Sequence, residues 1–113
     1  METTSEYEDV VAFVLIKTQP RAAAEVAAKV SRLRWTEEDE VGVAVLGVRW
    51  AAVVADSYNV MAAVRVRDEK ALEELVQERI RPIEGIVNPS TLVVEQLFRG
   101  GHLEGGFGHN GFP

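Results

Sequence analysis

"VRWAAVVADSYNVMAAVRV", residues 48–66, contains two apolar runs joined by the polar dipeptide Asp56-Ser57. This arrangement predicts a β-hairpin, because β-branched and apolar runs on both sides of a short polar turn favour strands. A hairpin with one solvated face alternates apolar and polar residues, but here both alternations are apolar. One set comprises Val48, Trp50, Ala52 and Val54, and the other comprises Ala51, Val53 and Ala55. Both faces of the predicted sheet therefore need to be covered.

The length and composition of the chain fit one globular domain, since its 113 residues are 47% hydrophobic and 27% charged. A domain of this size keeps a large surface for its volume, so association would add stability. No apolar run reaches the roughly 18 residues of a membrane span, and the acidic N-terminus does not resemble a signal peptide. The absence of cysteine excludes disulfides. We therefore expect a cytoplasmic protein that does not bind membranes.

The charged residues and the histidines exclude several other functions. A net charge of −6, with scattered Lys and Arg, argues against direct binding to nucleic acid. The only two histidines, His102 and His109, lie in a glycine-rich tail without further metal ligands. The tail motif "GFGHNG" (106–111) has the spacing GxGxxG, but no helix can follow it as a dinucleotide site requires. We expect no cofactor, no metal and no catalytic group.

Regular elements can be assigned along most of the chain from its periodicity. They are a strand (10–18), a helix (19–34), the hairpin (48–66), a second helix (67–82) and a final strand (91–98). Asp68 is the predicted N-cap of the second helix. Within the least clear segment, 35–47, the four acids 37–40 are predicted to form a solvated loop, and residues 41–47 form either an early strand portion or a covering loop. Residues 1–9 and the glycine-rich residues 99–113 are predicted to be flexible termini.

This order of elements predicts a ferredoxin-like βαββαβ fold of the α+β class. Two right-handed βαβ halves give a four-stranded antiparallel sheet with both helices on one face. No element of the chain then covers the other face, and each exposed large apolar side chain would forgo roughly 1.5–3 kcal/mol of burial. We therefore expect a second copy to pack sheet to sheet as a dimeric α+β barrel.

Two stretches carry a resemblance to a known family. "VVAFVLIKTQPRAAAEVAAKV" and "GVRWAAVVADSYNVMAAVRVRDEKALEELVQERIRPIEGIVNPSTLVVEQLF" resemble the effector-binding domain of the leucine-responsive/asparagine (Lrp/AsnC) transcription regulators. This is the RAM domain, an ACT-like module. The resemblance covers residues 10–98, apart from about a dozen residues near 35–46 that look like an insertion.

The resemblance implies a non-catalytic module for small effectors, commonly amino acids, that acts in transcription regulation. Members of the family form dimers through their sheets and assemble further into rings such as octamers. Full-length members also carry an N-terminal helix-turn-helix domain. Because nine residues precede the first predicted strand, we expect a stand-alone module here. It would reach DNA only by assembling with full-length Lrp/AsnC relatives.

The resemblance also implies a ligand-binding turn after the second strand of the family. That turn reads Gly, any residue, Tyr, Asp, and it falls on Asp56, Ser57, Tyr58 and Asn59. Tyr58 matches the pattern, whereas Asp56 replaces the glycine and Asn59 replaces the aspartate. An amide in place of a carboxylate removes a charge partner for the ammonium group of an effector. The structural alternative is that Asn59 caps backbone groups and Tyr58 packs at the sheet edge.

A second ligand-binding turn of the family precedes its last strand. Gly85, Ile86 and Thr91 match this turn, while Pro89 stands where another threonine is usual. Gly85 can serve both as a turn residue and as a point of close approach for a ligand.

Two alternatives for the function remain open. Dimeric α+β barrels also include small monooxygenases and isomerases, which place a buried polar residue in the cavity on the sheet side. The candidates for that role here are Arg49, Arg65 and Lys17. The other alternative is a structural partner that assembles with full-length regulators, and fold analogy alone does not separate these functions.

Overall fold

Strand β1 (Val10–Thr18) lies inside the sheet, between β4 (Val60–Val66) and β5 (Ile86–Val94), and pairs antiparallel with both. The computed structural model describes residues 9–106. Alternate side chains of β1 and β4 are buried on the same face of the sheet, as the apolar alternation requires. They are Val10, Ala12, Val14 and Ile16 of β1 and Val60, Ala62, Val64 and Val66 of β4.

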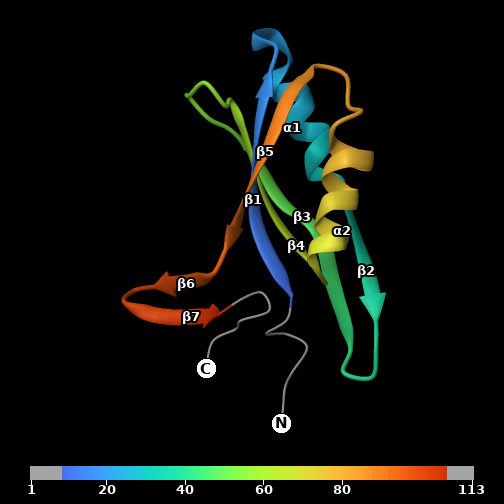
Figure 1. Ribbon diagram of the computed structural model, residues 1–113, viewed down its shortest axis with the longest axis vertical. Coiled ribbons are helices and arrows are strands. Elements are labelled where there is room, and N and C mark those ends of the chain that lie inside the picture. Colours follow the sequence, from blue (N-terminus) through green and yellow to red (C-terminus); the bar gives the residue numbers. More distant parts are fainter. Residues whose placement is uncertain (1–8, 107–113) are drawn as a thin grey trace.

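The five strands of this sheet lie in the order β2-β3-β4-β1-β5, with β2 at Arg34–Glu38 and β3 at Val43–Val53. Helices α1 (Ala23–Ser31) and α2 (Glu69–Glu74) both cover one face of it (Figure 1). Without β2, the order β3-β4-β1-β5 is that of the ferredoxin-like fold. The predicted fold is therefore confirmed, with one additional edge strand.

Both helical segments depart slightly from the predicted ranges. The first starts as a 3₁₀ turn (η2, Pro20–Ala22) before α1 begins. Asp68 is the N-cap of α2, as predicted, and its Oδ1 accepts a hydrogen bond from the Ala71 N–H at 2.7 Å. After α2 the helix continues with π geometry (η3, Leu75–Ile80) and ends before Pro82, which disfavours helix at the preceding residue.

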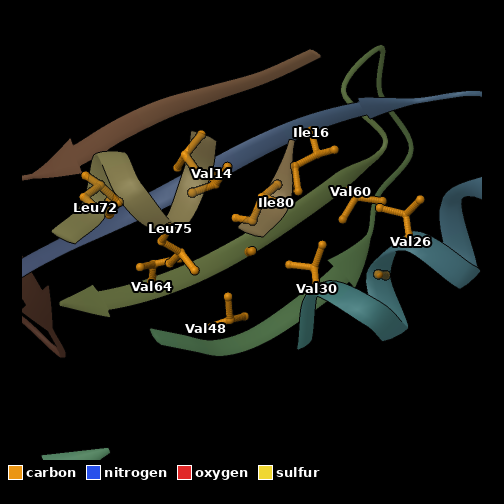
Figure 2. Close-up of a cluster of buried hydrophobic side chains, with 14 of the residues drawn as sticks. Val14, Ile16, Val26, Val30, Val48, Val60, Val64, Leu72, Leu75 and Ile80 are labelled. Atoms are coloured by element: carbon orange, nitrogen blue, oxygen red, sulfur yellow. The ribbon is translucent and has the colours of Figure 1, made fainter. Parts of the chain in front are cut away.

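The core lies between this helical layer and the sheet. Figure 2 shows Val14 and Ile16 of β1 packed with Val60 and Val64 of β4 under the helices. The helices contribute Val26, Val30, Leu72, Leu75 and Ile80, all of which are buried. Valine predominates because β-branched side chains pack well on a pleated surface.

A β-bulge in β3 determines which side chains of that strand join the core. Val48 pairs with Val64 and Trp50 pairs with Ala63, so Arg49 is an extra residue in the register. Because one inserted residue reverses the faces beyond it, Val48 is buried against the helices. Trp50 lies on the opposite face, where it is 45% exposed. The prediction that Val48 and Trp50 share one face is therefore wrong.

The unassigned segment 35–47 extends the sheet. It forms β2 and the first part of β3, which pair antiparallel from Arg34↔Gly47 to Glu38↔Val43. For residues 41–47, the early strand portion is therefore correct and the covering loop is wrong. The solvated loop predicted for the acids 37–40 is wrong at Glu37 and Glu38, which belong to β2. Gly47 has φ +92°, and a Cβ there would lie 2.4 Å from the Leu33 carbonyl oxygen. Glycine is therefore required at this position of β3, where its backbone packs closely against the residue before β2.

The last strand begins earlier than predicted. β5 starts at Ile86 and includes Pro89, which is buried opposite Ile16. Proline is tolerated there because β5 is an edge strand, in which half of the N–H groups have no ladder partner. The predicted range 91–98 is therefore wrong at both ends.

Beyond β5 the chain forms a separate hairpin of β6 (Gln96–Arg99) and β7 (His102–Gly106), visible at the lower left of Figure 1. No strand is predicted from the sequence for residues 99–106. Residues 1–8 and 107–113, with His109 and most of "GFGHNG", lie outside the described residues.

The contribution of the core can be tested at Ile16, whose side chain is fully buried. We expect Ile16→Ala to lower the free energy of unfolding by about 2–5 kcal/mol, because it leaves a cavity under the helices. Val87→Ala removes an exposed side chain from β5 and should change it by less than about 0.5 kcal/mol. Urea unfolding followed by circular dichroism measures both variants. Equal losses for the two would contradict this description of the core.

Candidate functional site

The first predicted ligand-binding turn joins β3 to β4. Its ends are held by a hydrogen bond from the Val54 N–H to the Asn59 carbonyl, at 2.9 Å. Within it, Asp56 Oδ1 accepts hydrogen bonds from the Ser57 N–H at 2.6 Å and from the Ser57 hydroxyl at 3.3 Å. No non-glycine residue in the described range 9–106 has a positive φ, so Asp56 replaces the glycine of the family without backbone strain. Tyr58 is half-buried beside them.

The side chain of Asn59 binds the end of β1. Its Oδ1 accepts a hydrogen bond from the Thr18 N–H at 2.9 Å, and its Nδ2 donates to the Thr18 carbonyl at a longer 3.5 Å. One amide thus satisfies a donor and an acceptor of the buried Thr18 backbone, which a carboxylate could not do. The structural alternative for Asn59 is therefore present in this fold, and its contact with an effector stays a prediction.

The second turn lies on the other side of Thr18. The Gly85 carbonyl accepts a hydrogen bond from the Gln19 N–H at 3.0 Å, and Ile86 pairs with Thr18 in the sheet. Gly85 has φ +100°, and a Cβ there would lie 2.9 Å from the Ala22 Cβ. Glycine is therefore required both by the backbone and by close packing on the first helical segment.

The two turns therefore lie at the same end of the sheet, the upper end in Figure 1, on either side of the end of β1. Thr91 is not among them. It pairs with Val14, four residues along β1 from Thr18, which corresponds to about 13 Å of strand. The structure thus brings together Asn59, Gly85 and Ile86, with Asp56, Ser57 and Tyr58 in the adjoining turn, and places Thr91 apart from them.

At the opposite end of the sheet lies an ion-pair network that the sequence pattern does not predict. Asp9, which is 3% exposed, accepts hydrogen bonds from Arg65 Nε at 3.1 Å and from an Arg67 terminal nitrogen at 3.3 Å. Arg67 also contacts Glu37 at 3.3 Å and Asp39 at 3.8 Å. Two half-buried arginines are thus matched by carboxylates, as burial of charge requires.

These contacts shift two pKa values in this network. The hydrogen bond to Glu37, followed by the contacts with Asp9, raises the pKa of Arg67 above its ordinary value. The pKa of Asp39 is lowered, chiefly because its carboxylate accepts hydrogen bonds from the Val41 and Gly42 N–H groups, with a further contribution from the charge of Arg67. Both shifts favour the charged forms, so these two groups are ionised at neutral pH.

The face of the sheet opposite the helices, here called the open face, is apolar. The rings of Phe13 and Trp50 meet on it with their centroids 6.2 Å apart. Leu92 pairs with Phe13 and is 54% exposed, and Met61 pairs with the half-buried Leu15. Val43 and Val45 of β3 extend this surface toward the ion-pair network and are exposed. In the described part of the chain, both helices lie on the other face (Figure 1).

Comparison with known proteins identifies the class to which this architecture belongs. The model of the Lrp/AsnC ligand-binding domain matches residues 11–99. The chain therefore belongs to the Lrp/AsnC ligand-binding domain family, a family of regulatory effector-binding domains, and the resemblance drawn from the sequence is confirmed. A comparison with curated protein sequences finds no significant match.

Several solved structures share the fold. TTHA0845 of Thermus thermophilus is 22% identical, with a TM-score of 0.63 over 80% of this chain and 98% of that one. Escherichia coli AsnC is 23% identical, with a TM-score of 0.64 over 88% of this chain and 62% of that one. The transcriptional regulator NMB0573 of Neisseria meningitidis, solved as an L-Met complex, is 18% identical, with a TM-score of 0.58 over 84% of this chain and 54% of that one.

The described residues include no helix that is long and apolar enough to cross a membrane.

The role of Asn59 in the fold can be tested by removing its side-chain amide. We expect Asn59→Ala to lower the free energy of unfolding by about 1–3 kcal/mol, because the Thr18 N–H loses its partner. Asn59→Asp keeps the acceptor and should lose less, and Asn88→Ala removes an exposed amide on β5 as the matched control. Chemical unfolding of the three variants measures these differences. An Asn59→Ala variant as stable as the Asn88→Ala control would show that the contact does not hold β1.

Proposed function

We propose that this chain is a non-catalytic regulatory module that dimerises sheet to sheet and binds an amino-acid-type effector, and so acts in transcription regulation. The observation that carries this proposal is the apolar open face, found on a chain that belongs to the Lrp/AsnC ligand-binding domain family. An apolar surface of this kind normally marks a site of association.

The chemistry of the open face favours a second copy as the partner. Its centre is formed by aromatic and long aliphatic side chains, while charged residues lie at its ends, Asp9 and Arg65 at one and Lys17 at the other. In a dimer with a twofold axis through this surface, the apolar centre of one copy packs against the apolar centre of the other. Aromatic residues such as Trp50 are also enriched in the cores of interfaces.

The two turns around Thr18 support the proposed effector site, which comprises Asp56, Ser57, Tyr58, Asn59, Gly85, Ile86 and Thr91. Because Asn59 is neutral and binds Thr18, the charge partner for an effector's ammonium must come from another residue. Asp56 offers a carboxylate in the same exposed turn, and only its Oδ1 is used by Ser57. The L-Met complex of the similar Neisseria meningitidis regulator supports an amino acid as the class of ligand.

Thr91 enters this site only if a neighbouring chain supplies it, since within one chain it lies away from the turns. The ring-like assemblies implied by the family provide such neighbours. Mixed assembly with full-length Lrp/AsnC relatives would connect effector binding to DNA, which this acidic chain is not suited to bind by itself.

The enzymatic alternative receives limited support from the position of its three candidate residues. Arg49 and Arg65 line one groove, but Lys17 lies at the opposite end of β1 from Asp9. The carboxylates of that groove are occupied by ion pairs and backbone hydrogen bonds. General acid–base chemistry needs a group with a free proton site close to the substrate. A binding function therefore accounts better for these residues.

The dimer can be tested with a charge on the open face. We expect the native chain to sediment as a dimer or larger at micromolar concentration, and Trp50→Asp to sediment as a monomer, because an unpaired carboxylate would be buried in the interface. Val53→Asp places the same charge on an exposed residue of the same strand on the helix side and should leave the mass unchanged. Analytical ultracentrifugation measures all three. A native chain that sediments as a folded monomer would refute the dimer.

The effector site can be tested by thermal shift with the common amino acids. A bound effector at about 1,000 times its Kd should stabilise the fold by roughly 4 kcal/mol, which raises the Tm. Tyr58→Ala should abolish this shift, whereas Tyr58→Phe should retain part of it if the ring contributes by packing. Sedimentation of the variants serves as the control for assembly. A full shift in Tyr58→Ala would show that the effector binds elsewhere.

A further inference from the structure

A hollow lies at the end of the sheet opposite to the two turns. It is a groove of about 640 Å³ between the β2–β3 connection and the ends of β3 and β4. Its walls come from three sources: the carboxylates Asp9 and Asp39, the arginines Arg49, Arg65 and Arg67, and the apolar segment 41–45. A hollow of this size falls in the range of small-molecule sites.

One arginine of the groove, Arg49, has no ion pair with another described residue. Three arginines and two aspartates line the groove, Glu37 beside it also binds Arg67, and both aspartates are already engaged. Asp9 binds Arg65 and Arg67, while Asp39 Oδ1 accepts hydrogen bonds from the Val41 and Gly42 N–H groups. Since both carboxylates of the groove have partners, it is suited to an anion and disfavours a cation.

Two of the arginines keep hydrogen-bond donors for such an anion. Arg67 is engaged by Asp9, Glu37 and Asp39. Arg65, in contrast, binds Asp9 through Nε, and within residues 9–106 its terminal nitrogens make no hydrogen bond. The guanidinium of Arg49 is exposed at the bulge and has no ion pair with another described residue. A guanidinium recognises a carboxylate by paired N–H donors.

The remaining wall is aliphatic. Val43 and Val45 belong to the open face of β3, and Val41 lies in the connection before them. Val43 is 64% exposed although it lies beside a charged network. A ligand with an apolar body would cover these side chains while its charged group met the arginines.

We propose that this groove is a second ligand site, for a small aliphatic monocarboxylate whose anionic group binds Arg49 and Arg65 and whose chain lies on Val43 and Val45. The site is formed by one chain. Val43 and Val45 lie at the margin of the open face, beyond the last β3–β4 pair (Gly47↔Arg65) and away from the Phe13–Trp50 centre of the proposed dimer interface. The site also lies apart from the Asp56–Asn59 turn, so it does not depend on the proposed effector site. Asp9 is a positioning residue, because it holds Arg65 and Arg67 on the wall of the groove.

Titration calorimetry with pentanoate tests this proposal, with acetate, inorganic sulfate and pentylammonium as comparison ligands. We expect pentanoate to bind most tightly, acetate and sulfate to bind more weakly because they lack an apolar chain, and pentylammonium not to bind. Sulfate binding as tight as that of pentanoate would reduce the groove to a general anion patch and overturn the assignment. Absence of pentanoate binding at millimolar concentration would also overturn it.

Paired variants place the ligand in the groove. Arg49→Gln should weaken pentanoate binding at least about tenfold, as expected for the loss of a charge-assisted hydrogen bond. Arg79→Gln removes the same charge from an exposed position on the second helical segment and should have no effect. Circular dichroism confirms that each variant is folded. Equal affinities for Arg49→Gln and Arg79→Gln would contradict the proposal.

The same titration separates the two sites. Tyr58→Ala should bind pentanoate like the native chain even if it loses its response to amino acids. Loss of pentanoate binding in Tyr58→Ala, with retention in Arg49→Gln, would assign the carboxylate to the turns and refute the groove site. Loss of the amino-acid response alone would leave the groove site intact.

Discussion

The extra residue in β3 is the constraint on which the arrangement of the surfaces depends. Where Arg49 is inserted, the register against β4 shifts, so that Val48 joins the core under α1 while Trp50 lies on the open face. A strand without the bulge would direct both side chains to one face. It would then either bury the indole under the helices or remove Val48 from the core. The bulge also directs Arg49 itself to the groove.

Several features of this fold follow from local sequence patterns and could be predicted. The alternation of β1 and β4, the helical spacing after Pro20 and the N-cap at Asp68 each involve residues close together in the chain. Their order is sufficient for a ferredoxin-like fold, because the handedness of βαβ units leaves few topologies.

The features that the sequence did not show depend on contacts between distant residues. Asp9 meets Arg65 and Arg67 across 56 and 58 residues, so its burial cannot be deduced from the polar segment around it. Pro89 lies in a segment that the sequence indicated as a turn, and only the position of β5 at the sheet edge shows why a proline fits inside a strand there. The substitution at Asn59 likewise gains its meaning only from Thr18, 41 residues earlier in the chain.

The two candidate sites are connected by the same pair of strands. β1 and β4 form an unbroken ladder from Val10↔Val66 to Ile16↔Val60. One end of this ladder is tied by the ion pairs of Asp9, and the other by the hydrogen bonds between Asn59 and Thr18. Side chains of the open face such as Phe13 and Met61 lie between these two ties and are therefore held on a rigid backbone.

A rigid apolar face lowers the entropy that association must overcome, because little of its backbone has to be ordered when a partner binds. The same ties hold the turn at Asn59 and the guanidinium of Arg65 in place before any ligand arrives. The polar contacts at the two ends of the ladder therefore contribute to preorganisation as well as to stability, since removal of one partner would leave the buried Asp9 carboxylate or the Thr18 N–H unsatisfied. In this chain, the valine core supplies the stability, and the ends of β1 fix the geometry of the binding surfaces.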